Sequence, residues 1–185
     1  DLYGISGFLN DMVGGVDLRV AEVFQPTCTI CGLTSGYQGP GVKTVLPAKA
    51  SAKIDFRLVP DQSPQEILQL LREHLDRRGF QDVHITDLGS EPAARTDPDH
   101  PFVTLVVESA RDVYGVPMQI IPMIGGSGPN YIFIDALKLP VVTLGFGYPG
   151  AQTHAPNENL RLDLYLKTAR HTARVISAAE RLPAG

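Results

Sequence analysis

One histidine, in a loop rich in glycine and proline, is the residue best placed to do chemistry in this sequence. His154 lies within residues 145–160, after the apolar run 140–144, which is typical of a strand covered on both faces. Loops beyond the carboxyl ends of strands are where open α/β sheets bind ligands. A neutral imidazole there can bind a metal ion. The alternative is a surface histidine without a role, and the loop alone does not decide between them.

Two further features place polar groups outside the predicted core. Residues 125–129 read Gly-Gly-Ser-Gly-Pro and open a short helix predicted near Pro129, where free amides would suit an anion such as a carboxylate. A tight turn followed by an N-cap would have the same sequence. Arg57 points away from the apolar side of a predicted strand, residues 42–59, and by itself is a solvated charge or half of a surface ion pair.

The glycine-rich segment also suggests a rival chemistry, because it nearly matches the Gly-x-Ser-x-Gly pattern of a serine nucleophile. Ser127, Asp135 and His154 follow one another in the order of an α/β-hydrolase triad. The fifth position is Pro129 instead of glycine, however, and a nucleophile elbow should follow a strand directly. Inhibition by a serine-directed phosphonate, without sensitivity to chelators, would favour this alternative.

Composition excludes several classes of function. The chain has 185 residues, 43% of them hydrophobic, which is enough for one domain or two small ones. A formal net charge of -4 and dispersed basic residues argue against nucleic-acid binding, and no apolar run is long enough to span a membrane. We interpret Cys28 and Cys31 as strand residues that do not form a disulfide, because alternation points them to opposite faces. This agrees with a cytoplasmic location.

The first half of the chain is predicted to form a small antiparallel sheet with a helix on one face. The expected elements are an irregular lead-in over residues 1–26 with at most a short helix at 6–12, strands at 26–33, 42–59 and 81–88, and a helix that opens with Ser63-Pro-Gln-Glu66 and stops at Gly79. The serine and glutamate form a capping-box pattern, and proline suits the first helical position. Glycine is the usual residue after a helix end.

A shift to proline and polar residues around 91–98 predicts a domain boundary, with one domain at residues 27–92 and another at 93–185. The second half is predicted to contain a helix at 99–114 capped by Gly115, a strand at 118–121, the short helix near Pro129, a strand at 141–144 and a helix at 163–181. This alternation indicates a parallel sheet covered by helices. His74, His84, His100 and His171 match no motif and are interpreted as structural or surface residues.

Four short motifs, in order, resemble one enzyme family. They are Lys-Thr-Val-Leu-Pro at 43–47, Asp-Phe-Arg-Leu-Val-Pro at 55–60, the glycine-rich segment at 125–129 and His-Ala-Pro-Asn-Glu at 154–158. Together they resemble the carnosine dipeptidase branch of the dinuclear-zinc metallopeptidases, from about residue 26 to 182. Glutamate carboxypeptidase, aminoacylase and succinyl-diaminopimelate desuccinylase are relatives in this superfamily.

The resemblance implies an α/β fold in which the end of an α+β lid, or dimerisation, domain precedes the last αβαβα segment of a zinc-peptidase catalytic domain. It implies that Arg57, Gly126 and Ser127 bind the terminal carboxylate of a peptide or acyl amino acid, and that a partner subunit contributes Thr44 to that pocket in a homodimer. His154 would bind one of two zinc ions, for which manganese is an alternative. The family carries glutamate where this chain has Ile124, which leaves the preference at the substrate's amino end open.

Most of a dinuclear site is missing from the sequence. The family supplies ligands and a catalytic base from a His-x-Asp motif, a bridging aspartate and a Glu-Glu pair, and this chain has neither a His-x-Asp nor adjacent glutamates. We therefore expect no catalytic base in this chain. The competing hypothesis is a dimerisation or peptide-binding module that keeps the fold without metals, and the metal content of the complete protein would separate the two.

We also expect these 185 residues to be the carboxyl-terminal part of a longer polypeptide and to be inactive alone. Only two strands are predicted in the second half, which is too few for a stable parallel sheet, and the carboxylate ligands are absent. The test is to express the chain alone and assay dipeptide hydrolysis. A monomer with a cooperative melt and chelator-sensitive activity would contradict the prediction.

Overall fold

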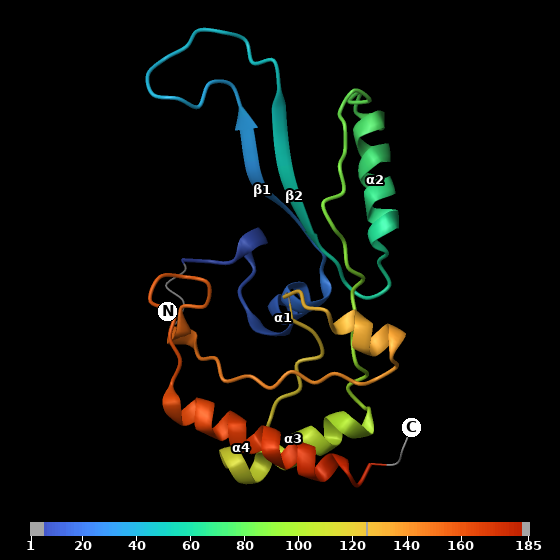
Figure 1. Cartoon of the computed structure of the whole chain (residues 1–185), viewed down its shortest axis with the longest axis vertical. Helices are drawn as coiled ribbons and strands as arrows, with labels where there is room; N and C mark the ends of the chain where they lie inside the picture. The colour runs from blue at the N-terminus through green and yellow to red at the C-terminus, as the bar shows by residue number, and fades with distance from the viewer. Residues whose placement is uncertain (1–5, 125, 183–185) are drawn as a thin grey trace. The chain divides into compact units, whose positions relative to one another are not determined.

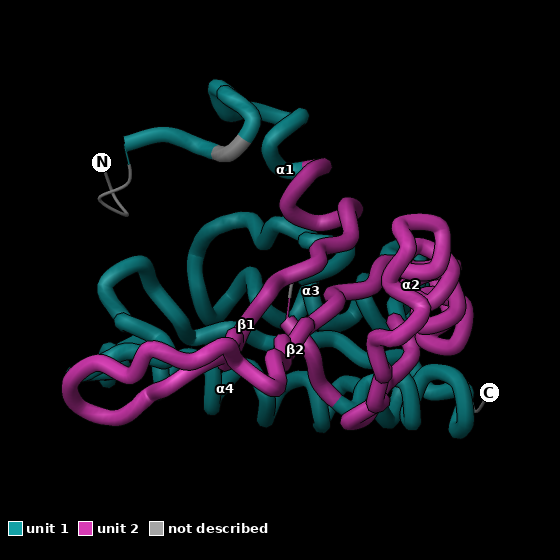
Figure 2. Tube along the Cα trace, turned by 90° about the horizontal axis from the view of Figure 1, so that it is seen from above, with its two compact units in different colours: residues 1–19, 94–124, 129–185 teal, residues 20–93, 125–128 magenta. Residues whose placement is uncertain are grey.

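The computed structural model describes residues 6–124 and 126–182. The chain divides into two compact units, which Figure 2 colours separately. One comprises residues 1–19, 94–124 and 129–185, and the other comprises residues 20–93 and 125–128. The start of the predicted lead-in (1–5), Gly125 of the glycine-rich segment and the last three residues (183–185) lie outside the described residues.

The unit made of residues 20–93 and 125–128 contains a two-stranded antiparallel hairpin (Figure 1). Strand β1 (Thr27–Ser35) pairs with β2 (Ala50–Arg57), in a register that places Thr27 opposite Arg57. The second strand is shorter than predicted, because residues 42–49 belong to the connection and make no ladder. Its apolar side is also less covered than predicted, and Ile54 is 41% exposed.

A β-bulge interrupts this hairpin at the second cysteine. The register passes from Ile30 opposite Ile54 to Gly32 opposite Lys53, so Cys31 is the extra residue. Its thiol contacts the Lys53 carbonyl at 3.4 Å. Both cysteines lie in β1 and are free, as predicted, and both are exposed. The strict alternation used to predict their faces does not hold across a bulge.

Helix α2 (Pro64–Arg77) begins and ends where the sequence predicts. Ser63 is the N-cap residue, but the capping box does not form, because the Ser63 hydroxyl bonds to the Gln65 side chain at 3.0 Å instead of a backbone amide. Gly79 has φ 85°, the left-handed conformation that ends helices at glycine. The chain then turns back, and the Phe80 amide donates to the Leu75 carbonyl at 2.9 Å.

The strand predicted at residues 81–88 is not formed. Arg72 of α2 instead binds this segment, donating to the carbonyls of Phe80 at 2.8 Å and Val83 at 2.5 Å. Asp76, one helical turn further on, orients the guanidinium because its carboxylate accepts a 2.9 Å hydrogen bond from Arg72 Nε. A side chain therefore satisfies carbonyls that a neighbouring strand would otherwise bind.

Two long helices form the core of the unit made of residues 1–19, 94–124 and 129–185. Helix α3 (Pro101–Tyr114) packs on α4 (Leu162–Ala179), close to the predicted bounds, and Gly115 caps α3 in the left-handed conformation (Figure 1). His100 is the N-cap of α3, since its Nδ1 accepts from the Phe102 amide at 3.1 Å. The buried residues are Val103, Val106, Ala110, His171 and Val175.

The amino-terminal region is more helical than predicted. After a single 3-10 turn, Leu9–Asp11, helix α1 spans Gly15–Phe24, where we expected irregular backbone. Gly14 and Gly15 both have positive φ, so the glycines that obscured the pattern mark the start of the helix instead of preventing it. Val23 is its buried residue.

The predicted strands at 118–121 and 141–144 are not formed, so the described residues contain no parallel sheet. The Thr96 hydroxyl accepts from the Val141 amide and donates to the Val141 carbonyl, each at 2.8 Å. One side chain thus satisfies both main-chain groups that a ladder would use. Among the described residues, no helix is both long enough and apolar enough to cross a membrane.

Replacing His171 should destabilise the pair of helices α3 and α4. The ring is 3% exposed, its Nε2 lies 2.9 Å from the Val106 carbonyl, and it packs edge-on against Tyr114 at 5.5 Å between ring centroids. His171→Ala should lower the free energy of unfolding by about 2 to 4 kcal/mol, because it removes buried contacts and a buried hydrogen bond. Urea denaturation measures this loss.

The matched control is Arg174→Ala on the same helix. Arg174 forms a 2.8 Å ion pair with Asp112, but both side chains are more than half exposed. Exposed pairs contribute at most about 1 kcal/mol, so this variant should remain close to wild type. Equal losses in the free energy of unfolding for the two variants would show that burial of His171 adds no stability.

Candidate functional site

The loop that carries His154 is closed by its own hydrogen bonds. A 3-10 turn, Pro149–Ala151, begins it, with the Ala151 amide donating to the Tyr148 carbonyl at 2.9 Å. At the other end the Asn159 amide donates to the Ala151 carbonyl at 3.0 Å, which joins the two ends. Residues 148–159, hereafter the histidine loop, therefore form a compact loop of the kind that often carries function.

Three residues of the histidine loop adopt the left-handed conformation: Gln152 (φ 53°), His154 (φ 62°) and Asn157 (φ 64°). This region costs an ordinary L-residue roughly 1 to 2 kcal/mol. The conformation persists only if other contacts hold it. His154 lies between the other two and is exposed.

His154 can supply one nitrogen ligand to a metal ion. Within residues 6–124 and 126–182, its ring makes no hydrogen bond or ion pair, so the imidazole is available. The same residues contain no group of three or more histidine, cysteine, aspartate or glutamate side chains that could hold a metal. The ring fits a metal centre as a single ligand, and the other ligands are not among the described residues.

A second polar cluster joins two of the sequence motifs. Arg57, the last residue of β2, donates from Nη1 to the Ser127 hydroxyl at 2.5 Å, across 70 positions of sequence. Its Nε lies 2.9 Å from Asp55 Oδ2, and both side chains of this ion pair are nearly half exposed. The structure therefore brings together two residues predicted to bind a carboxylate, and adds an aspartate that sequence reasoning missed. Period-two alternation places Asp55 and Arg57 on the same strand face and could have suggested the pair.

The other two predicted binding residues, Thr44 and Gly126, are both exposed. Thr44 lies exposed in the long connection between β1 and β2 instead of in a strand. Gly126 is exposed beside Ser127. The helix expected near Pro129 is a short π-helix, Ile132–Ala136, so Ser127 precedes it without starting it. Ser127 acts here through its hydroxyl, not through a helix start.

Ser127, the serine of the alternative triad, has an arginine partner in the structure. Its hydroxyl accepts a hydrogen bond from the Arg57 guanidinium, whereas a nucleophilic serine would donate its own proton to a histidine. The His154 ring makes no hydrogen bond with Asp135, which lies in the π-helix. The aspartate of such a triad orients the histidine base, so the missing bond argues against a triad built from His154 and Asp135.

An ion pair follows the histidine loop at the start of α4. The Arg161 guanidinium donates two hydrogen bonds to Asp163, at 3.0 and 2.8 Å. These bonds lower the pKa of the Asp163 carboxyl and raise the pKa of Arg161. Both side chains are about half exposed, so the pair has a local effect on the start of the helix.

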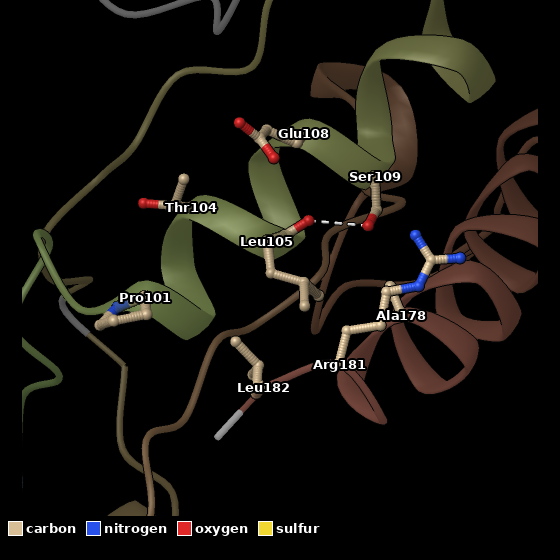
Figure 3. Close-up of a pocket in the computed structure, with 8 residues that line it drawn as sticks. All are labelled: Pro101, Thr104, Leu105, Glu108, Ser109, Ala178, Arg181 and Leu182. Carbon is tan, nitrogen blue, oxygen red and sulfur yellow. Dashed lines mark hydrogen bonds between the residues drawn. The ribbon is translucent and has the colours of Figure 1, made fainter.

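A concave pocket of about 370 Å³ lies against α3 and the end of α4 (Figure 3). Thr104, Leu105 and Glu108 line it from α3, and Arg181 and Leu182 line it from beyond α4. None of the predicted site residues lines it.

Comparison with known proteins gives consistent matches. The model of "Peptidase family M20/M25/M40" matches residues 5–178. The Cys-Gly metallodipeptidase dug1 of Schizosaccharomyces pombe is 29% identical over 77% of this chain and 31% of its own length. The Beta-Ala-His dipeptidase of Rattus norvegicus is 25% identical over 86% of this chain and 34% of its own length.

Solved structures agree with these matches. An M20 family metallo-carboxypeptidase, Sso-CP2 from Sulfolobus solfataricus, is 36% identical with a TM-score of 0.82, over 95% of this chain and 41% of that one. The di-peptidase Dug1p from Saccharomyces cerevisiae is 25% identical with a TM-score of 0.71, over 91% of this chain and 36% of that one. The chain thus spans about a third of the length of its curated relatives.

Proposed function

Because the chain belongs to peptidase family M20/M25/M40, we propose that it is the carboxyl-terminal part of a metal-dependent hydrolase that cleaves the amide bond of dipeptides or acyl amino acids. The curated relatives include a Cys-Gly metallodipeptidase and a Beta-Ala-His dipeptidase, and one similar structure is a metallo-carboxypeptidase. All three names describe hydrolysis next to a residue with a free carboxylate. The proposed substrates share that group.

The observation that carries this proposal is the hydrogen bond between Arg57 and Ser127. Family membership alone gives the fold and the class of reaction. The bond joins two motifs and leaves an arginine that is 45% exposed beside a serine hydroxyl. A guanidinium offers a planar pair of donors to a carboxylate, and a charged hydrogen bond of this kind is stronger than a neutral one. We propose Arg57, Gly126 and Ser127 as the carboxylate-binding residues.

His154 would hold a metal ion through one ring nitrogen. Two zinc ions, or manganese, are the proposed cofactors, and when bound they would supply an activated water and polarise the scissile carbonyl. The residues of this chain bind and orient the substrate. We place no catalytic base among them, because the described residues bring no carboxylate to His154.

The remaining proposals concern assembly and location. Thr44 would reach the carboxylate pocket of a partner subunit, in a homodimer formed through the lid, which we assign to residues 27–92. Residues 93–185 would belong to the catalytic domain. A cytoplasmic location remains a prediction that is compatible with the two free thiols.

Replacing His154 tests the metal site. In the complete protein, His154→Ala should lose one metal ion and nearly all turnover. Substituting residues that only support metal ligands already costs ~10- to 100-fold, so loss of a ligand should cost more. Elemental analysis of the folded variant measures metal content, and His84→Ala is a control at an exposed histidine outside the loop. Unchanged metal stoichiometry in His154→Ala would refute the ligand role, and absence of metal from the wild-type protein would favour a non-catalytic module.

Replacing Arg57 tests the substrate carboxylate. Arg57→Lys keeps the charge but loses the planar fork, so KM should rise ~10- to 100-fold for substrates with a free terminal carboxylate, as expected from one charged hydrogen bond. Substrates with an amidated terminus should be almost unaffected. Steady-state kinetics on matched free and amidated dipeptides make the comparison. Equal losses on both would show that Arg57 is structural.

A further inference from the structure

We propose that Asn159 is a positioning residue that holds the histidine loop in the conformation that presents His154. The inference rests on the proposed function, because the role assigned to Asn159 is to support a metal ligand. It concerns a residue that follows the family-like motif at 154–158 and that no sequence pattern singled out.

The Asn159 side chain uses both of its hydrogen-bonding ends. Nδ2 donates to the Gly150 carbonyl at 3.2 Å and to the Asn157 carbonyl at 3.1 Å, and Oδ1 accepts from the Tyr148 hydroxyl. An asparagine amide offers two N–H donors and one carbonyl oxygen, so both donors and the acceptor are engaged. No other side chain within the described part of the histidine loop makes three such bonds.

These bonds span the histidine. Gly150 precedes His154 by four positions and Asn157 follows it by three, so one amide group ties the backbone on both sides of the ring. The Asn159 amide adds a third tie, to the Ala151 carbonyl. His154 itself makes no hydrogen bond or ion pair with the residues that the structure describes, and its backbone is left-handed. The hydrogen bonds of Asn159 therefore compensate for backbone strain at His154, which has no hydrogen bond of its own within the described part of the chain to do so.

The Asn159 hydrogen bonds should strengthen metal binding by His154. A ligand held in place before the metal arrives loses less conformational freedom on binding than one in a mobile loop. Without the Asn159 side chain, the histidine loop keeps only single-turn backbone bonds and the Asn159–Ala151 bond. The left-handed residues would then relax toward commoner conformations. Metal affinity should fall while the fold of α3 and α4, which does not use this residue, is kept.

The experiment measures Co²⁺ binding to the metal-free complete protein by chelator competition. Asn159→Ala should weaken the affinity ~10- to 100-fold, as expected for a residue that supports a metal ligand. Tyr148→Phe removes a single hydrogen bond and should weaken it roughly 2- to 10-fold. Thr153→Ala is the matched control, because Thr153 is an exposed polar residue of the same loop whose side chain makes no hydrogen bond with the described residues. It should stay within about twofold of wild type.

Two further readouts separate positioning from general stability. The visible spectrum of the Co²⁺ protein should change in Asn159→Ala, because a displaced imidazole alters the coordination geometry. In the metal-free protein, hydrogen exchange at the amides of Ala155, Glu158 and Asn159 should accelerate while Tm is unchanged. A merely structural role would lower Tm and leave the spectrum unchanged.

The outcomes are distinguishable. If wild type and Asn159→Ala bind Co²⁺ equally, with the same spectrum, the positioning role is wrong and the proposed function stands. If the wild-type protein binds no Co²⁺, both are wrong. Should Asn159→Ala fail to fold, Tyr148→Phe decides, and Co²⁺ affinity and exchange rates equal to wild type in that variant would overturn the inference.

Discussion

Main-chain polar groups outside helices and ladders need hydrogen-bond partners, and in this chain polar side chains supply many of them. Thr96 pairs with both main-chain groups of Val141, and Arg72 binds the carbonyls of Phe80 and Val83. Asn159 does the same for Gly150. The described residues contain one two-stranded sheet, so few of these groups can be satisfied by strand pairing. The irregular segments, which carry His154 and Ser127, depend on such side chains for their conformation.

The same constraint explains which elements the sequence could predict. Helices α2, α3 and α4 were predicted correctly because a helix depends on local signals. Pro64 marks the start of α2, and Gly115 marks the end of α3. A strand depends on a partner elsewhere in the chain, which an apolar run does not specify. The predicted strands at 81–88, 118–121 and 141–144 are wrong for this reason. The resemblance and the α/β fold class are nevertheless confirmed, by the family match and by the solved structures.

In the candidate site, the sequence identified residues that take part but not the neighbours that support them. Ser127 and Arg57 were singled out from separate motifs, and the structure places them in contact. Asp55 was not singled out, because a charge beside an arginine on a strand face is usually a surface pair. Asn159 and Tyr148 could not be found at all, since their bond depends on how the histidine loop folds. Supporting residues of this kind lack a spacing rule, because tertiary structure, not sequence distance, brings them to the residue they support.

The geometry around Arg57 restricts how a carboxylate could bind it. A guanidinium can present either its two Nη nitrogens or the pair formed by Nε and one Nη. Asp55 already occupies Nε, and Ser127 accepts one bond from Nη1. The Nη2 donors and the remaining Nη1 donor are therefore the ones left for a ligand, so a carboxylate would approach from the Nη end. The Ser127 hydroxyl accepts from Arg57 and keeps its own proton, which it can donate to the same ligand. A lysine at position 57 could not divide its donors in this way, because its ammonium is a point charge without a fixed fork.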